Sequence, residues 1–271
     1  MSIILSIAGS DPSAGAGIQQ DLKTITALGE YGATVITALT SQNTMGVDAV
    51  MSVPADVVCS QMESVLSDLD VAAIKIGMVP NVEVARVVAD KLRRYLSGHR
   101  VSVVYDPVMV STSGRELMTT ECVEFVRQSL FPLCTLVTPN LSETACLSGI
   151  PLEQLDGSEP HNDRREKAGK LLSAKCGVAF LLKGGHAHSA QMTDHLYLPD
   201  GTVHTYSAPR IESTNLHGTG CTLSSAIATY LANGHPLPDA VRAAKEVLQR
   251  AVIQGRDLHI GHGNGPLWVN N

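Results

Sequence analysis

Strand-length apolar runs alternate with segments of helical periodicity along most of this 271-residue chain. The apolar runs are rich in β-branched residues and continuous rather than alternating, which is typical of strands buried on both faces. Repeated strand–helix–strand units predict an α/β fold, with a mainly parallel sheet and helices on both sides. The predicted strands are 3–8, 33–39, 72–76, 101–105, 136–138 and 178–182, and the predicted helices between them are 16–28, 55–68, 82–96, 121–130 and 164–174.

The pattern changes in the last third of the chain. Segments 195–198 and 203–206 flank Pro199-Asp200-Gly201, whose residue types favour a tight turn, so an antiparallel hairpin is expected at one edge of the sheet. Two further helices are expected over 222–233 and 238–254, and a loose loop over 155–163. Because no linker or internal repeat interrupts the pattern, we expect one domain over residues 1–271.

Charge and hydropathy argue against several kinds of partner. The formal net charge is −6 and no stripe of Lys and Arg offsets it, which argues against nucleic acid. No apolar run approaches the roughly 18 residues of a membrane span, and the first residues lack the basic and long apolar segments of a signal peptide. The six cysteines show no CxxC pair and no disulfide-framework spacing. These features predict a cytoplasmic protein.

The turn His217-Gly218-Thr219-Gly220-Cys221 directly precedes the apolar helical run 222–233. A glycine-bracketed turn at a helix start directs unpaired N–H groups toward one point, where the helix dipole also favours negative charge. Phosphate is the expected occupant. The same position should lower the pKa of the Cys221 thiol toward neutrality, as a general base requires. The alternative is an ordinary strand-to-helix turn with a buried cysteine.

Several residues fall directly after predicted strands, where ligands of open α/β sheets bind. They are Gly9, Gln42, Gly77, Asp106, Asn140 and Lys183. The amide of Gln42 both donates and accepts hydrogen bonds, which suits a heteroaromatic ring with adjacent amino and ring-nitrogen groups. Met78 offers a polarizable thioether to such a ring. The plainer alternatives are a turn residue at 42 and a core residue at 78.

The same edge carries oxygen donors and a cation. Asp106, Asn140 and Glu143 offer carboxylate and amide oxygens that could hold Mg²⁺, usually through water. Lys183 could neutralise charge on phosphate oxygens. In the plainer interpretation, Asp106 ends a strand, Glu143 caps a helix and Lys183 is solvated.

Three common nucleotide and metal motifs do not fit. Gly15-Ala16-Gly17-Ile18-Gln19-Gln20 has glutamine where the dinucleotide fingerprint requires glycine or alanine, and no GxxxxGK[ST] occurs. The histidine pairs His186/His188 and His259/His262 have no further ligands for a usual zinc set. Asp21, about one helical turn beyond Gly17, is either a ligand contact or a solvated helix carboxylate.

With these motifs in place, the chain resembles the hydroxymethylpyrimidine/phosphomethylpyrimidine kinases of thiamine biosynthesis, in the ribokinase-like superfamily. The resemblance covers almost the whole chain. It rests on residues 8–13, 16–24, 38–44, 75–78, 138–143, 183–186 and 217–224. It implies a three-layer αβα sandwich and an ATP-dependent phosphorylation of 4-amino-5-hydroxymethyl-2-methylpyrimidine, and then of its monophosphate.

The resemblance also implies roles for single residues. Gly218, Thr219 and Gly220 form the anion hole, with Cys221 as catalytic base. Gln42 binds the aminopyrimidine, and Gly9, Asp21 and Met78 line its pocket. Asn140 and Glu143 match an NxxE element that organises Mg²⁺ and the ATP phosphates, while Lys183, Asp106 and Thr219 lie beside those phosphates. Family members are typically cytoplasmic homodimers, and a monovalent cation is a further candidate cofactor.

Two features bear on the choice within this superfamily. Cys221 stands where most sugar kinases and ordinary pyridoxal kinases carry aspartate, which favours the pyrimidine kinase over the alternative, a cysteine-type pyridoxine or pyridoxal kinase. A non-catalytic sensor of a vitamin precursor is the third hypothesis, and the intact transfer residues argue against it. Ala14 stands where relatives usually carry glycine, and alanine tolerates a positive φ poorly.

Overall fold

A computed structural model describes residues 1–109, 117–155, 162–184 and 190–270. Within these residues nine strands form one sheet, in the order β3-β2-β1-β4-β5-β6-β7-β8-β9. Six of them pair in parallel, as predicted. They are β1 (Ile3–Ser10), β2 (Tyr31–Asn43), β4 (Val71–Ile76), β5 (Ser102–Tyr105), β6 (Leu136–Val137) and β7 (Ala179–Leu182).

Both edges of the sheet are antiparallel. The predicted hairpin is confirmed as β8 (Gln191–Tyr197) and β9 (Val203–Pro209), which follow β7. At the other edge β3 (Gly46–Ser52) pairs with β2, and this strand was not predicted. Beyond Leu39 the residues of β2 are exposed or half-buried, so the apolar signal ended while main-chain pairing continued. Gln42 therefore lies inside β2 rather than directly after a strand.

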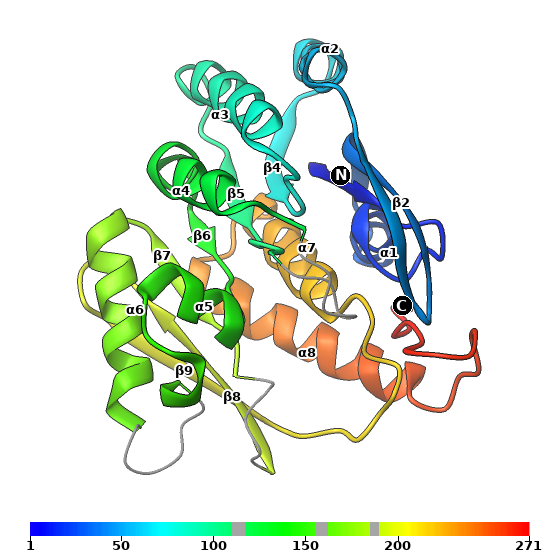
Figure 1. Cartoon of the computed structure of the whole chain (residues 1–271), viewed down its shortest axis with the longest axis vertical. Helices are drawn as coiled ribbons and strands as arrows, with labels where there is room; N and C mark the ends of the chain where they lie inside the picture. The colour runs from blue at the N-terminus through cyan, green and yellow to red at the C-terminus, as the bar shows by residue number, and fades with distance from the viewer. Residues whose placement is uncertain (110–116, 156–161, 185–189, 271) are drawn as a thin grey trace.

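Helices cover both faces of the sheet and make a three-layer αβα sandwich (Figure 1). One apolar core lies between the sheet and α2 (Ala55–Asp68), α3 (Val82–Leu96), α4 (Thr120–Ser129) and α6 (Asn162–Cys176). The other lies between the sheet and α1 (Gly17–Ala27), α7 (Thr219–Ala232) and α8 (Leu237–Gly255). The architecture is the one expected of a ribokinase-like protein.

Most helix predictions hold, with two differences. Helices α2 and α3 begin and end at the predicted residues, whereas α7 begins three residues early, so that Thr219, Gly220 and Cys221 form its first turn. The short helix α5 (Leu141–Ser148) and the 3-10 turns η1 (Phe131–Leu133) and η2 (Leu152–Gln154) were not predicted. The expected loop 155–163 lies mostly outside the described residues. None of the helices within the described ranges is long and apolar enough to cross a membrane.

Candidate active site

Helix α7 begins without a side-chain cap. Its N-cap is Gly218, whereas α3 and α5 are capped by the side chains of Asn81 and Asn140. Across the described ranges, no main-chain acceptor takes up the N–H groups of Gly220 and Cys221. Because helix-start amides need an external partner, these two are available to an anion.

Glycine is required at position 218 by the backbone. Its φ of 89° lies in the left-handed region, and a Cβ there would lie 2.0 Å from the carbonyl oxygen of Gly15. A Cβ at Gly15 would in turn lie 2.3 Å from Cδ2 of His217. The loop after β1 and the turn before α7 are therefore packed main chain against main chain, although they are about 200 residues apart in the sequence.

Asp106 and Lys183 lie beside this helix start. Nζ of Lys183 is 2.7 Å from Oδ1 of Asp106, and a Cβ added to Gly220 would lie 2.8 Å from Oδ2 of Asp106 and 3.5 Å from that Nζ. Burial acts to lower the pKa of Lys183, but the carboxylates of Asp106 and Glu143 raise it above its ordinary value. The ammonium predicted to neutralise phosphate is therefore charged and adjacent to the free amides.

Asn140 and Glu143 cap helix α5. Oδ1 of Asn140 accepts from the N–H of Glu143 at 2.9 Å, and Oε2 of Glu143 accepts from the N–H of Asn140 at 2.7 Å. The helix-capping interpretation of Glu143 is thus correct, and its carboxylate also accepts from the N–H of Met109.

The environment of Glu143 also suits a cation. Burial and then the nearby Asp106 raise the pKa of Glu143 to about 7, against the opposing effect of Lys183. Two carboxylates in a largely buried region, with an amide oxygen beside them, form the oxygen donor set that Mg²⁺ prefers. The residues present therefore fit a magnesium ion.

The thiol of Cys221 does not have the lowered pKa that its position at a helix start predicts. Burial raises the pKa of Cys221 to about 11, and Asp21 and Asp106 add to the rise. The ammonium of Lys75 and a hydrogen bond from the N–H of Gly17 act in the opposite direction. The prediction was wrong because burial and two carboxylates outweigh the helix start and one cation.

Asp21 is fully buried, although it was predicted to line the substrate pocket. Its carboxylate lies 2.8 and 2.9 Å from Nζ of Lys75, and it accepts from Oγ of Ser6 at 2.6 Å and Oγ of Ser225 at 2.7 Å. Ser225 lies one helical turn after Cys221 on α7. Asp21 therefore lies behind the candidate site and not on its surface.

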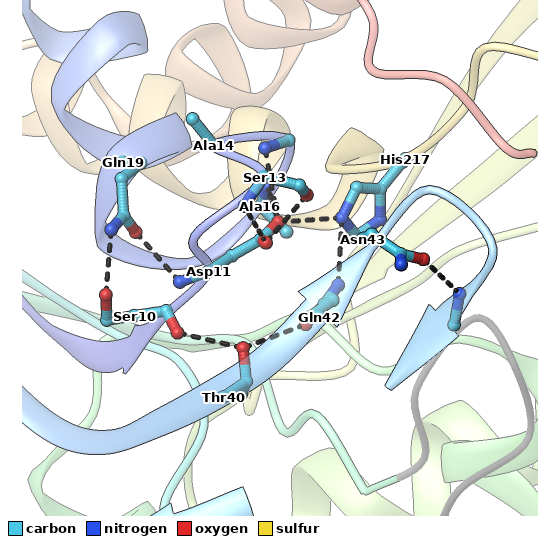
Figure 2. A network of polar contacts seen from close by, with 12 residues as sticks. Ser10, Asp11, Ser13, Ala14, Ala16, Gln19, Thr40, Gln42, Asn43 and His217 are labelled. Carbon is cyan, nitrogen blue, oxygen red and sulfur yellow. Dashed lines mark hydrogen bonds and ion pairs between the residues drawn. The ribbon is translucent and has the colours of Figure 1, made fainter. Parts of the chain in front are cut away.

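The other residues predicted to bind the substrate lie on β1, on β2 and in the segment after β4. Met78 is buried, and a Cβ at Gly9 would lie 3.2 Å from its Sδ, so these two predicted pocket residues lie together. The amide of Gln42 lies 3.0 Å from Nε2 of His217, and the same nitrogen lies 2.9 Å from Oδ2 of Asp11 (Figure 2). The structure thus links Gln42, the glutamine predicted to bind the substrate ring, directly to the turn that begins α7.

Asp11 organises the loop after β1. Its carboxylate accepts from the N–H and Oγ of Ser13 and from the N–H groups of Gly15 and Ala16 (Figure 2). Burial acts to raise the pKa of Asp11, but the hydrogen bonds from His217 and Ser13 hold it below its usual value. Ala14, inside this loop, has φ 58° and is the one non-glycine residue with positive φ in the described part of the chain.

Sequence reasoning gave no role to Asp11, Lys75 or His217, or to the residues after α8. An aspartate two residues before serine is an Asx-turn signal, and a lysine inside an apolar strand signals a buried charge that needs a partner. The segment after α8 has no periodic pattern. It nevertheless runs back along the β2–β3 hairpin, where Thr44 bonds the N–H groups of His262 and Gly263.

This fold and site define the class of ribokinase-like kinases. The sheet has helices on both faces, and the free amides that begin α7 lie beside a lysine and oxygen donors at the ends of neighbouring strands. Comparison with known proteins narrows the class. The family model described as phosphomethylpyrimidine kinase matches residues 11–268, and the chain belongs to that family.

Individual relatives agree with this assignment. A Rhizobium meliloti protein named hydroxymethylpyrimidine/phosphomethylpyrimidine kinase is 49% identical over 266 residues, covering 98% of this chain and 96% of that protein. The crystal structure of phosphomethylpyrimidine kinase from Clostridium difficile 630 has a TM-score of 0.78 and 36% identity, covering 93% of this chain and 100% of that one. An ADP complex of Bacillus subtilis pyridoxal kinase has a TM-score of 0.87 and 30% identity, covering 99% and 97%.

Proposed function

We propose that this protein transfers the γ-phosphoryl group of ATP to the hydroxymethyl oxygen of 4-amino-5-hydroxymethyl-2-methylpyrimidine. A second transfer, to the resulting monophosphate, gives the diphosphate used in thiamine biosynthesis. The observation that carries the proposal is the adjacency of Gly220, Asp106 and Lys183, with Gln42 linked to the same turn through His217. Membership of a kinase family whose relatives are named for both steps supports it.

The chain's own groups account for most of what phosphoryl transfer requires, which is alignment and charge neutralisation. The amides of Gly218, Gly220 and Cys221 would hydrogen-bond the oxygens of the migrating group. The N–H of Thr219, also predicted for the anion hole, instead donates to the carbonyl of Leu216 at 3.3 Å. The ammonium of Lys183 would neutralise their charge. Asp106 holds that ammonium in place through their ion pair.

Asp106, Glu143 and Asn140 would hold Mg²⁺, with water and phosphate oxygens completing its shell. When bound, the ion supplies further neutralisation of the ATP phosphates. Lys183, together with the ion that the carboxylates would hold, would offset the negative charge of the phosphates.

Cys221 would accept the proton of the attacking hydroxyl. With a pKa of about 11 the thiol is largely protonated at neutral pH, and only the minor thiolate form can take this proton, becoming the thiol as the new oxygen–phosphorus bond forms. Lys75 and the N–H of Gly17 favour that thiolate. In this assignment the proton passes from Cys221 to solvent before the next transfer.

A pyridoxine or pyridoxal kinase is the second candidate, because the Bacillus subtilis pyridoxal kinase shares the fold closely. The test is kcat/KM for the aminopyrimidine alcohol and for pyridoxal, with ATP and Mg²⁺. We expect a clear preference for the pyrimidine. A preference for pyridoxal would contradict the proposed substrate and leave the kinase assignment standing.

We also propose that the chain acts as one kinase domain in a cytoplasmic homodimer. Strand β3 is last in the strand order at one side of the described sheet, and exposed Met45 and Met51 lie on or beside it, with Tyr31 and Leu39 exposed on β2. Exposed apolar side chains gathered at one side of a sheet favour contact with a second copy. All six cysteines are free thiols, as a reducing compartment favours. Light scattering during size-exclusion chromatography tests the dimer, and a monomer at micromolar concentration would contradict it.

A further inference from the structure

The side-chain amide of Gln42 lies between two polar groups of the chain. One end lies 3.0 Å from Nε2 of His217 and the other 3.2 Å from Oγ1 of Thr40 (Figure 2). The two ends of an amide have nearly the same shape, so the hydrogen bonds decide which end carries the oxygen. Each neighbour of Gln42 has a second partner, and those partners determine where its proton lies.

At the histidine end, the partner is the carboxylate of Asp11. This carboxylate already accepts from Ser13, Gly15 and Ala16, and it lies 2.9 Å from Nε2 of His217. A carboxylate that accepts several hydrogen bonds remains ionised and has no proton to offer. Nε2 of His217 must therefore carry the proton, whether the ring is neutral or charged. The amide end that faces it has to be the oxygen.

At the threonine end, the partner is a main-chain carbonyl. Oγ1 of Thr40 lies 3.0 Å from the carbonyl oxygen of Ser10, which can only accept. A hydroxyl group has one proton, and here it goes to Ser10. The hydroxyl oxygen can then only accept from Gln42, so this amide end has to be the nitrogen.

The two ends lead independently to the same orientation. The opposite one, with the nitrogen toward His217 as drawn in Figure 2, brings two donors together at His217 and needs two protons on Thr40. The favoured orientation gives an unbroken chain of donors. It runs from Gln42 through Thr40 to the carbonyl of Ser10, and at the other end the single Nε2–H of His217 is shared between Asp11 and Gln42.

We propose that Asp11, His217 and Thr40 are positioning residues that fix the Gln42 amide with its oxygen toward His217, and that this orientation selects the ring of the substrate. The inference rests on the proposed function and deepens it. The fixed amide has one N–H and one oxygen lone pair left. The N–H can donate to a ring nitrogen, and the oxygen can accept from the adjacent amino group. The reverse pairing is not possible.

The 4-oxo analogue of the pyrimidine has the opposite order, because its carbonyl replaces the amino group and its ring nitrogen carries a proton. Bound to the fixed amide, this analogue would place its ring N–H against the amide N–H and its carbonyl oxygen against the amide oxygen. Two unsatisfied groups of this kind should weaken binding by about 100-fold or more. An amide that could rotate by half a turn would bind either ring.

The test is calorimetric binding of both rings, without ATP, to the wild type and three variants. We expect the wild type to prefer the amino ring by about 100-fold or more. In His217→Ala and in Thr40→Val, which is isosteric but lacks the hydroxyl, the preference should fall below about 10-fold. Thr40→Ser keeps the hydroxyl and should keep the preference.

Three outcomes separate the claims. An unchanged preference in both His217→Ala and Thr40→Val would overturn the inference and leave the proposed function intact. A wild type that binds pyridoxal and neither pyrimidine would contradict the proposed function itself. The protonation of His217 gives a readout independent of any ligand: long-range ¹⁵N–¹H spectra should show a proton on Nε2, and a proton on Nδ1 alone would overturn the proposed orientation.

Discussion

Nζ of Lys75 lies 2.8 and 2.9 Å from the two carboxylate oxygens of Asp21, and both side chains are completely buried beneath the first turns of α7. Burial acts to lower the pKa of Lys75, but Asp21 and then Cys221 raise it well above its ordinary value. Lys75 thus places a positive charge against the helix that presents the candidate base. Its pairing with Asp21 connects the stability of the fold to the chemistry of the site.

Removing Lys75 should therefore affect stability and activity separately. Lys75→Met leaves Asp21 buried and unpaired, which should cost about 3–5 kcal/mol of unfolding free energy. In Lys75→Met/Asp21→Leu most of that loss should be recovered, while kcat remains reduced because Lys75 favours the thiolate of Cys221 more than Asp21 disfavours it. Urea unfolding and steady-state kinetics measure the two effects.

Lys170→Met, which breaks an exposed pair with Glu166, is the control and should change stability by under about 0.5 kcal/mol. A fully active double variant would contradict the role assigned to Lys75.

The raised pKa of Cys221 predicts an alkaline rate profile. A base must be deprotonated to act, and below a pKa of about 11 the thiolate fraction rises with pH. Single-turnover rates should therefore increase from pH 7 to pH 10 without a plateau. Cys221→Ala should lose about 10²–10⁴ in rate together with this slope. Cys146→Ala, at an exposed cysteine, should retain both. A rate that levels off below pH 8 would contradict the burial argument.

Glu143 predicts a pH-dependent stability of defined sign. Its pKa is raised to about 7 in the folded protein, whereas the unfolded chain titrates near 4.3. Between these values the folded state binds more protons, so its stability should fall as pH rises from about 4.5 to 7 and change little above. At pH 7.5 without Mg²⁺, Glu143→Gln should be more stable than the wild type by about 1–3 kcal/mol. Thermal unfolding at several pH values measures this effect, and equal stability at pH 5 and pH 7.5 would contradict it.

The same variant tests the magnesium assignment. Glu143→Gln should require a higher Mg²⁺ concentration for half-maximal activity, because a neutral amide binds a hard cation less well than a carboxylate. Glu124→Gln, at an exposed glutamate on α4, is the control and should behave as the wild type. An unchanged Mg²⁺ requirement in Glu143→Gln would remove this residue from the proposed cation site.

Ala14 carries a measurable backbone strain. Its φ of 58° favours glycine, so Ala14→Gly should stabilise the protein by about 1 kcal/mol. Ala16→Gly is the matched control, because Ala16 has an extended φ of −141° and should gain nothing. Denaturant unfolding of both variants decides the point, and a loss of stability in Ala14→Gly would contradict it.

The sandwich was predictable because its strands are apolar on both faces and its helices are amphipathic. Those signals depend on burial, and they end where burial ends. Strand β3 and the last residues of β2 are half-exposed, so their pairing left no apolar pattern, and Gln42 was placed after a strand instead of within one.

The residues of the candidate site were proposed from sequence motifs, whereas its electrostatics could not be predicted from them. The turn 217–221 and the residues at the strand ends suggested phosphate chemistry through their residue types and their positions relative to the predicted strands and helix. The raised pKa of Cys221 depends on Asp21 and Asp106, which lie about 200 and 115 positions away in the sequence. The contacts of His217 with Asp11 and Gln42 likewise join three distant segments. Such effects follow from the packing of the fold, which local sequence patterns do not contain.

The central claim is that the start of α7, with Lys183 beside it, transfers a phosphoryl group to a pyrimidine held by Gln42. The most direct measurement is mass analysis of products after incubation with ATP, Mg²⁺ and 4-amino-5-hydroxymethyl-2-methylpyrimidine. The account predicts the monophosphate first and then the diphosphate, both lost or strongly reduced in Lys183→Met. The absence of any phosphorylated pyrimidine from the wild-type reaction would contradict it.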